Sequence, residues 1–315
     1  MPTPGPLPPE ITHALREAFG DAPIADLAVM TGGRSGATLL SLRVEGRGYV
    51  LRRSDPSRPG HAIRSTRELG CVRIASDRGV APRLVHLDEA HGVIVMERVD
   101  AVPGARRPDH VASTLRRLHD GPPFPTGRGS TAVAMVAFAS ETLRGRGRPG
   151  LPGELLRTMS DLAKVTRRHA ETAPCHNDLN PSNLLATAEA VYFVDWETAG
   201  QGDPFFDLGE LGVFAFTTPE TRAALLEAYV GRTPTDEERA RAEVGRVMAL
   251  GFFAAAFMLG AGEDVDLEGT PLTITELLPL LATHRASHEV AAAALFGEMR
   301  RSAATDAFRA ARDAL

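Results

Sequence analysis

The sequence predicts an α+β fold with two lobes, a small strand-rich lobe followed by a large helix-rich lobe. Short apolar runs separated by glycine-rich turns dominate the first third of the chain, which is typical of strands joined by tight turns. The later part carries longer stretches with apolar residues at helical spacing. We therefore expect a small lobe over residues 1–99 and a large lobe over residues 100–315.

The first lobe is expected to hold strands around one helix. A Pro/Gly-rich break at 56–60 precedes a run with helical spacing of Ile, Leu and Val, which predicts a helix over 61–77. Residues 88–92 contain the polar turn of a hairpin. The predicted strands are 28–31, 38–44, 49–53, 82–87 and 93–97.

Helical patterns dominate the second lobe. The exception is 183–195, where two apolar runs flank a short polar turn and predict a hairpin. The most apolar stretch, 247–261, has about 15 residues, whereas a membrane-spanning helix needs roughly 20, so we expect a buried core helix there. The predicted helices are 109–119, 153–170, 219–229, 235–260 and one from 273 to the C-terminus.

Composition narrows the class of protein. Lys plus Arg (35) against Asp plus Glu (40) gives a formal net charge of -5, which gives no reason to expect a nucleic-acid partner. Cys71 and Cys175 lie far apart without metal-like spacing, so a reducing compartment is the simpler interpretation. Residues 1–10 lack the basic segment and apolar run of a secretory signal. We expect a cytoplasmic protein with no membrane partner, and the oligomeric state stays open.

The segment 175–211 gathers polar residues with a regular spacing. If 184–194 form a hairpin, Asn183 and Asp195 emerge side by side at its open end, and Asp178 lies on the loop that enters it. Two carboxylates and one amide then offer the hard oxygen ligands that Mg²⁺ prefers. A carboxylate can also accept a hydroxyl proton. Singly, such residues are common turn formers and helix caps, but the spaced set predicts a catalytic site.

The same segment resembles the catalytic loop of kinases. The run HNDLNPSN at 176–183 has the spacing of the protein-kinase loop H-R-D-x-x-x-x-N, and DWE at 195–197 stands where that fold places D-F-G. It is more similar still to the aminoglycoside phosphotransferase and choline kinase superfamily. There, His-x-Asp-x-x-x-x-Asn is followed by Ile/Val-Asp-Trp/Phe-Glu and a Gly-Asp-Pro…Asp-Leu stretch, here 202–208. The resemblance covers most of the chain and implies a bilobal protein-kinase-like fold.

This resemblance implies a small-molecule kinase that moves the γ-phosphoryl group of ATP, bound with Mg²⁺, onto a hydroxyl. Asp178 would orient the hydroxyl and accept its proton, while Asn183 and Asp195 would hold Mg²⁺. His176 belongs to the same catalytic loop and would brace it rather than react. The residues expected to support the site structurally are Asp203 and Asp207.

Two departures separate the chain from protein kinases. Asn180 replaces the lysine of the loop HRDLKPEN, which removes a cation aimed at the γ-phosphate, and Glu197 replaces the glycine of D-F-G. Both changes fit small-molecule kinases.

The nucleotide would be covered by the first lobe. The stretch 32–36 lies between two predicted strands and is glycine-rich, so backbone N–H groups can approach a phosphate, although such a stretch is also typical of a hairpin turn. Its expected nucleotide-binding members are Gly32, Gly33, Ser35 and Gly36. Arg52 stands where kinases place the phosphate-binding lysine, and Glu68 is its expected partner. Arg53 competes for this role because strand alternation points only one of the two inward.

The strand 93–97 and the residues after it resemble the kinase hinge. Met96 would line the adenine pocket, and the Glu97 carbonyl and the Val99 N–H would bind the base.

The acceptor is expected to be a small hydroxyl compound, either a choline- or ethanolamine-like amino alcohol or a related metabolite, and it can be cationic. Asn177 gives the loop a His-Asn-Asp start, as in choline- and ethanolamine-kinase-like members, whereas aminoglycoside enzymes more often have His-Gly-Asp. The acidic run 263–268 is either a solvated loop or an attractor of cations. An antibiotic phosphotransferase and a nucleotide-binding scaffold with little turnover are the alternatives.

Overall fold

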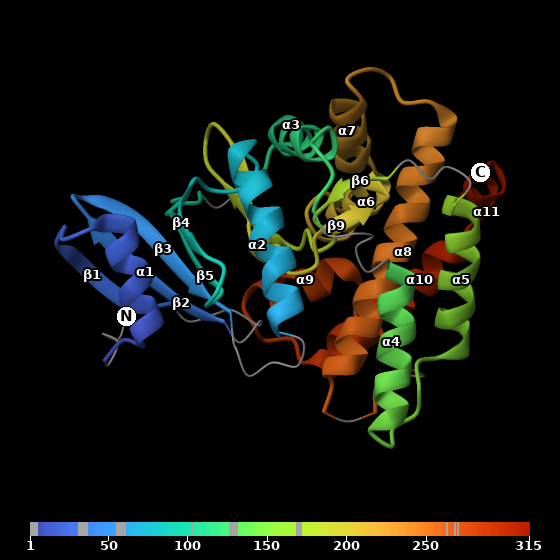
Figure 1. Cartoon of the computed structure of the whole chain (residues 1–315). Coiled ribbons are helices and arrows are strands. Elements are labelled where there is room, and N and C mark those ends of the chain that lie inside the picture. Colours follow the sequence, from blue (N-terminus) through green and yellow to red (C-terminus); the bar gives the residue numbers. More distant parts are fainter. Residues whose placement is uncertain are drawn as a thin grey trace.

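The computed structural model describes residues 6–30, 37–54, 61–102, 104–125, 132–167, 172–262, 264–267, 269 and 271–315, with the side chains of 61–66 left aside. A strand-rich part lies at one end of the molecule and a helical body at the other (Figure 1). The predicted α+β class with a small strand-rich and a large helix-rich lobe is confirmed.

The small lobe is built on a five-stranded antiparallel sheet in the order β1-β2-β3-β5-β4. Its strands are β1 Ile24–Val29, β2 Thr38–Val44, β3 Arg47–Arg53, β4 Leu84–Asp88 and β5 Val93–Glu97. Helix α1, Pro9–Phe19, packs Ile11 and Leu15 against Leu40 and Leu51 on one face. Because side chains alternate along a strand, Arg52 projects from the opposite face, toward the helical lobe.

Helix α2, His61–Asp77, lies between the sheet and the helical body (Figure 1). Its Leu69 and Val72 belong to a buried cluster that also contains Ile94 of the sheet and Leu115 and Trp196 of the helical lobe. The two lobes therefore share this apolar cluster, while each lobe also has a cluster of its own.

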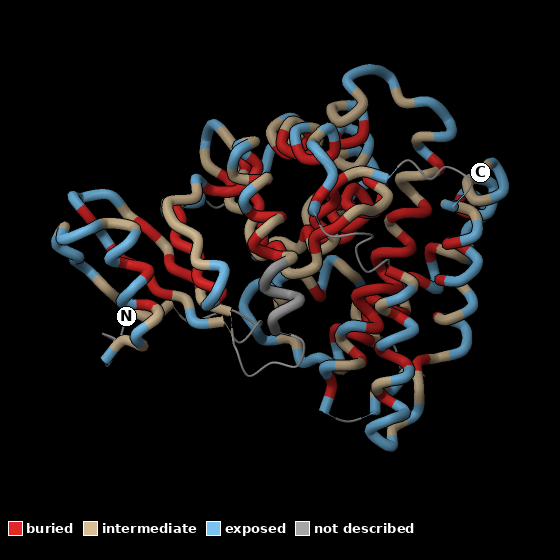
Figure 2. The backbone as a smooth tube through the Cα atoms, in the orientation of Figure 1, coloured by how far each residue is buried: buried red, intermediate tan, exposed pale blue. Residues whose placement is uncertain are grey.

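The large lobe is organised around α8, Asp236–Gly260. Of the described helices, α8 alone is long and apolar enough to cross a membrane, but 72% of its most apolar window is buried inside the protein. Figure 2 shows the middle of this helix as buried, and residues 247–255 form an unbroken buried stretch. The other helices are α3 Pro108–His119, α4 Ala132–Gly145, α5 Gly153–Thr166, α6 Pro204–Phe214, α7 Pro219–Val230, α9 Ile274–Ala282, α10 His288–Ala303 and α11 Asp306–Asp313.

Four short strands carry the segment with the kinase-like motifs. They are β6 Ala173–Cys175, β7 Leu184–Ala186, β8 Val191–Phe193 and β9 Gly200–Gly202, with β6 paired to β9 and β7 paired to β8. A 3-10 turn, Pro181–Asn183, leads directly into β7. The predicted hairpin after Asn183 is present.

Several predicted boundaries were wrong. The first strand covers Ile24–Val29 rather than 28–31, and the helix predicted over 153–170 ends at Thr166. The single C-terminal helix predicted from 273 is three helices, because Ser287 and Thr305 each cap a new helix start with a side-chain hydrogen bond. Three helices, α1, α4 and α6, were not predicted.

Candidate active site

The loop after β6 is held by carboxylates of helix α6. Asp207, which is fully buried, accepts hydrogen bonds from the backbone N–H groups of His176 and Asn177, each at 2.9 Å. Glu210, one helical turn further on, accepts from the N–H of Leu179 at 2.8 Å. Buried N–H groups need such acceptors, so α6 fixes the course of the loop backbone on both sides of Asp178.

Asp178 is oriented by two amide side chains. Asn183 donates its Nδ2 to Oδ2 of Asp178 at 3.0 Å, and Asn180 donates its Nδ2 to Oδ1 at 3.0 Å. Burial raises the pKa of Asp178 to about 7; the two amide hydrogen bonds oppose the shift, and the charges of Asp195 and Glu197 add to it. The result is a positioned carboxyl group that can change protonation near neutral pH.

Asn183 and Asp195 meet at the open end of the β7–β8 hairpin. The N–H of Val194 donates to the carbonyl of Asn183 at 3.0 Å, which brings the backbones at the two positions together. The Asn183 Nδ2 is occupied by Asp178, and its Oδ1 accepts one hydrogen bond from Ser182 Oγ at 3.4 Å, which leaves a second lone pair for a ligand. Asp195 has a left-handed backbone with φ of 66°, a strained conformation that is typical of functional positions.

The donor set fits Mg²⁺. One amide oxygen and the carboxylates of Asp195 and Asp178 are hard oxygen ligands, and the Asp195 side chain keeps 29% of its surface exposed. The convergence of these three residues agrees with the geometry that the sequence spacing predicts. Their chemical roles stay predictions.

His176 lies inside the core and supports the loop. Its side chain is fully buried, and its Nε2 donates to the carbonyl of Val194 at 3.0 Å. The imidazole packs on the indole of Trp196, with ring centroids 4.7 Å apart. Burial lowers the pKa of His176, which favours the neutral ring. A buried side chain with this hydrogen bond can brace the loop, and its role stays a prediction.

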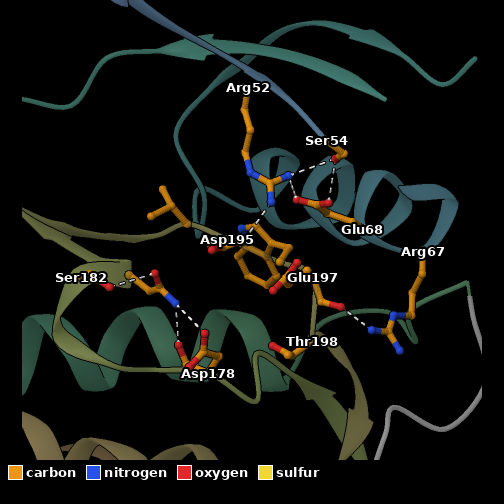
Figure 3. A network of polar contacts seen from close by, with 12 residues as sticks. Arg52, Ser54, Arg67, Glu68, Asp178, Ser182, Asp195, Glu197 and Thr198 are labelled. Atoms are coloured by element: carbon orange, nitrogen blue, oxygen red, sulfur yellow. Dashed lines mark hydrogen bonds and ion pairs between the residues drawn. The ribbon is translucent and has the colours of Figure 1, made fainter. Parts of the chain in front are cut away.

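Arg52 is the arginine that points toward the site. It is 8% exposed and forms an ion pair with Glu68 of α2, while Arg53 pairs with Glu10 of α1. Of the two arginines between which strand alternation left the choice open, Arg52 is thus the one that points toward the helical lobe. Burial raises the pKa of Glu68 and its pairing with Arg52 opposes this shift. Figure 3 shows Arg52 between Glu68 and Asp195.

The residues after Asp195 fold back on the loop. Asn177 adopts a left-handed backbone with φ of 61°, and its Nδ2 donates to the carbonyl of Thr198 at 3.2 Å. Thr198 returns a hydrogen bond to the carbonyl of His176 at 3.1 Å. Arg67 of α2 donates to the carbonyl of Glu197 (Figure 3), so α2 contacts this segment directly, while Asp195 is contacted from β3 by Arg52.

Asp203 supports the site as a helix cap. Its side chain accepts from the N–H of Phe205 at 3.0 Å at the start of α6, and it pairs with Arg241 of α8 at 3.1 Å. Burial raises the pKa of Asp203, and Arg241 opposes the shift. Asp203 therefore fixes the start of the helix that carries Asp207.

Three supporting residues were missed by the sequence reasoning. Glu210 lies three positions after Asp207, on the same face of α6, and this spacing could have revealed it. His119 contacts Asp207 through Nε2 at 3.1 Å, and its Nδ1 contacts the Tyr229 hydroxyl at 2.8 Å. His119 and Tyr229 are brought there by tertiary packing, for which the sequence gives no local signal.

The remaining nucleotide-binding predictions are tested less directly. Gly32, Gly33, Ser35 and Gly36 lie outside the described residues. Met96 is 9% exposed at the boundary of the shared core, and the N–H of Glu97 donates to the carbonyl of Arg83 at 2.9 Å. Among the described residues, none accepts a hydrogen bond from the Val99 N–H. The hinge role of these residues stays a prediction.

The two-lobed fold with a β-strand arginine, a helix α2 glutamate and an Asp/Asn/Asp set on a loop and hairpin defines the protein-kinase-like class. A family model described as "Phosphotransferase enzyme family" matches residues 27–243, more than half of the chain. The chain belongs to this phosphotransferase family.

Individual relatives agree with this assignment. The chain is 27% identical over 213 residues to thiamine kinase from Salmonella typhimurium, covering 65% of this chain and 71% of that one. It is 42% identical over 60 residues to protein LicA from Haemophilus influenzae, a match spanning 19% of this chain and only 22% of LicA. The crystal structure of a choline/ethanolamine kinase family protein from Mesorhizobium loti superposes with a TM-score of 0.70 at 23% identity, covering 96% of this chain and 98% of that one. This last likeness supports the fold.

Proposed function

We propose that this protein is a small-molecule kinase that transfers the γ-phosphoryl group of ATP to a hydroxyl of an amino alcohol or a related metabolite. The observation that carries the proposal is the set formed by Asp178, Asn183 and Asp195 at the open end of one hairpin. Catalysis of phosphoryl transfer depends on positioning and on stabilising negative charge, and this set can do both.

Asp178 is the proposed base. Both of its carboxylate oxygens accept amide hydrogen bonds, which fixes the direction in which the carboxylate meets an acceptor hydroxyl. With a pKa raised to about 7 by burial, Asp178 can take up the hydroxyl proton as the oxygen attacks phosphorus. The proton then leaves with the phosphorylated product or returns to water as the site opens.

Asn183 and Asp195 are the residues that would hold Mg²⁺. When bound there, the ion would supply positive charge that offsets the negative charge developing during transfer. Asn183 offers its Oδ1 because its Nδ2 is bound to Asp178, and Asp195 offers the carboxylate oxygen that faces away from Arg52. On the nucleotide side, Arg52, supported by its partner Glu68, would contact the phosphates.

The proposed class of acceptor is supported by a chemical feature that the compounds mentioned in the relatives' names have in common. Choline, ethanolamine and thiamine each carry a primary hydroxyl and a cationic nitrogen, and the names of two relatives refer to these compounds. The carboxylates of Asp178, Asp195 and Glu197 give the site a negative field that favours such cations. We therefore place cationic primary alcohols ahead of neutral sugars.

Asn177 supports this choice less directly than its position in the motif suggests. Its backbone is left-handed, a conformation that glycine and asparagine tolerate best, and its side chain binds the carbonyl of Thr198. Asn177 thus holds the segment after Asp195. The left-handed backbone explains why this position is either Asn or Gly, because both residues tolerate that conformation.

A phosphate-transfer screen with Mg-ATP tests the proposal. Amino alcohols, thiamine, neutral sugars and aminoglycosides are compared as acceptors, and product formation is read by mass of the phosphorylated compound. We expect at least one cationic primary alcohol to be phosphorylated. Asp178→Asn keeps the shape but loses the carboxylate charge and can accept only one of the two amide hydrogen bonds, so it should lower turnover by about 10²- to 10⁴-fold with little change in nucleotide affinity.

Two results would contradict the proposal. If aminoglycosides were the only acceptors phosphorylated, the protein would instead be an antibiotic phosphotransferase. The absence of transfer to every acceptor, with nucleotide binding intact, would indicate a binding scaffold.

A further inference from the structure

One guanidinium group, that of Arg52, joins three polar side chains at the junction of the lobes. Its NH1 donates to Glu68 Oε1 and, at 3.3 Å, to Ser54 Oγ, while its NH2 donates to Asp195 Oδ1 at 3.1 Å (Figure 3). Ser54 in turn donates to the second oxygen of Glu68 at 3.3 Å. Arg52 therefore binds its helix partner and the proposed metal ligand at the same time.

This double contact depends on arginine. A guanidinium is a planar fork whose nitrogens can serve two carboxylates in different directions, whereas a lysine ammonium is a single point charge. The Arg52 and Glu68 side chains are 9% and 4% exposed, so solvent screens their charges weakly. The single positive charge of Arg52 is therefore shared between two carboxylates, and the nitrogen that contacts Asp195 is in place before any metal arrives.

A cation held against Asp195 opposes a second cation at the same carboxylate. Oδ1 of Asp195 is already occupied by Arg52, and the remaining oxygen carries only part of an uncompensated negative charge. A divalent ion bound there would lie within a few ångströms of the guanidinium, where like charges repel strongly in a partly buried setting. A nucleotide changes this balance, because its phosphates bring enough negative charge for both cations.

We propose that Arg52 is the resident counter-cation of Asp195 and that it makes divalent metal binding conditional on the nucleotide. Free Mg²⁺ or Mn²⁺ binds poorly to the nucleotide-free protein, and the metal enters as its nucleotide complex once phosphate oxygens have engaged Arg52. This inference rests on the metal role proposed for Asp195 and adds an order of binding to it.

The test is a titration of nucleotide-free protein with Mn²⁺, followed by the loss of the free-ion electron paramagnetic resonance signal. Removing Arg52 alone would leave Glu68 buried and unpaired, so the informative variant is Arg52→Gln/Glu68→Gln, in which a neutral pair replaces the ion pair. We expect this double variant to bind one Mn²⁺ at least about tenfold more tightly than the parent. Adding Asp195→Asn should remove the gain.

Arg53→Gln is the matched control, because it deletes the neighbouring positive charge, which pairs with Glu10 on the other face of the sheet. We expect it to bind Mn²⁺ as the parent does. Trp196, the single tryptophan of the chain and the neighbour of Asp195, gives an independent fluorescence readout of folding and of metal binding.

Two outcomes would overturn the proposal. One is a folded double variant that binds Mn²⁺ no more tightly than the parent, and the other is an equal gain in Arg53→Gln. Since neither nucleotide nor acceptor is present, the titration gives its answer whether or not the acceptor screen detects transfer.

Discussion

Glu210 supports the catalytic loop with one carboxylate oxygen and leaves the other without a partner. Oε2 accepts from the N–H of Leu179, while Oε1 is buried without a hydrogen-bond partner among the described residues. Burial raises the pKa of Glu210 well above its usual value, and the nearby charges of Asp207 and Asp178 raise it further. Folding therefore favours the protonated form of Glu210.

This raised pKa predicts a pH dependence of stability. Below about pH 4.5, Glu210 is protonated in both the folded and the unfolded chain; above it, the unfolded chain ionises while the folded one resists. The parent thus loses stability as the pH rises through this window. Glu210→Gln keeps an acceptor for Leu179 and cannot ionise, so its stability relative to the parent should increase by at least about 1 kcal/mol between pH 5 and pH 8.

Urea unfolding of both proteins at the two pH values measures this difference. Glu276→Gln is a suitable control, because Glu276 lies exposed in a capping box and its pKa is lowered, which places its titration below pH 5. Its effect should be the same at both pH values. A constant difference for Glu210→Gln as well would show that Glu210 is ionised in the folded protein.

At the level of residues, the sequence predicted the groups that chemistry constrains and missed those that packing supplies. The spacing of Asp178, Asn183 and Asp195 was sufficient because a loop and a hairpin bring them together locally. His119 reaches Asp207 from a helix 88 positions away, a contact that depends on the assembled lobe.

The crossing of α6 over α8 positions the catalytic loop at the scale of elements. Gly209 of α6 faces Gly245 of α8 so closely that a Cβ on Gly245 would lie 2.1 Å from the carbonyl oxygen of Phe205. Backbone atoms cannot yield as a flexible side chain can, so both glycines are required for this approach. Since α6 carries Asp207 and Glu210, the distance between α6 and α8 determines where the catalytic loop lies relative to α8.

Gly245→Ala should therefore separate the two helices. We expect it to lower the free energy of unfolding by about 1–3 kcal/mol or more, through overpacking, and to lower turnover because the shift of α6 is passed to the loop. Gly145→Ala at the end of α4 is the control, since a Cβ there meets nothing within 4 Å. Equal stabilities of parent and Gly245→Ala, measured by chemical denaturation, would contradict the close crossing.

Helix α6 also explains why some elements escaped prediction. Every residue of Pro204–Phe214 is buried, so the segment lacks the polar face that reveals an amphipathic helix. Helix α1 was hidden by the proline-rich residues around it, whereas α2 and α8 were recognised by spacing or by their long apolar run. The three-way division of the C-terminal region depends on caps at single residues.

At the scale of the whole molecule, the division of the chain near Asp100 separates the five-stranded sheet with α1 and α2 from the helical lobe with its four short strands, but one buried apolar cluster crosses it. Sheet residues Ile94 and Met96 and helix α2 pack in the same buried cluster as α3 and Trp196. The boundary between 99 and 100 as a limit of independent folding stays a prediction, and the shared cluster argues against it. A lobe removed from its partner would expose this cluster to water.

The shared cluster predicts that the protein unfolds in one cooperative transition. Trp196 is 2% exposed at the centre of the cluster and is the single tryptophan of the chain, so its fluorescence reports the junction of the lobes. Far-UV circular dichroism reports the helices, most of which lie in the large lobe. We expect the two signals to change together in urea, with the same midpoint and slope.

Leu69→Ala, which truncates a buried α2 side chain of the cluster, should move both midpoints by an equal amount, corresponding to about 2–5 kcal/mol. If the fluorescence midpoint alone shifted, the junction would open before the helical body, and the lobes would be separate folding units.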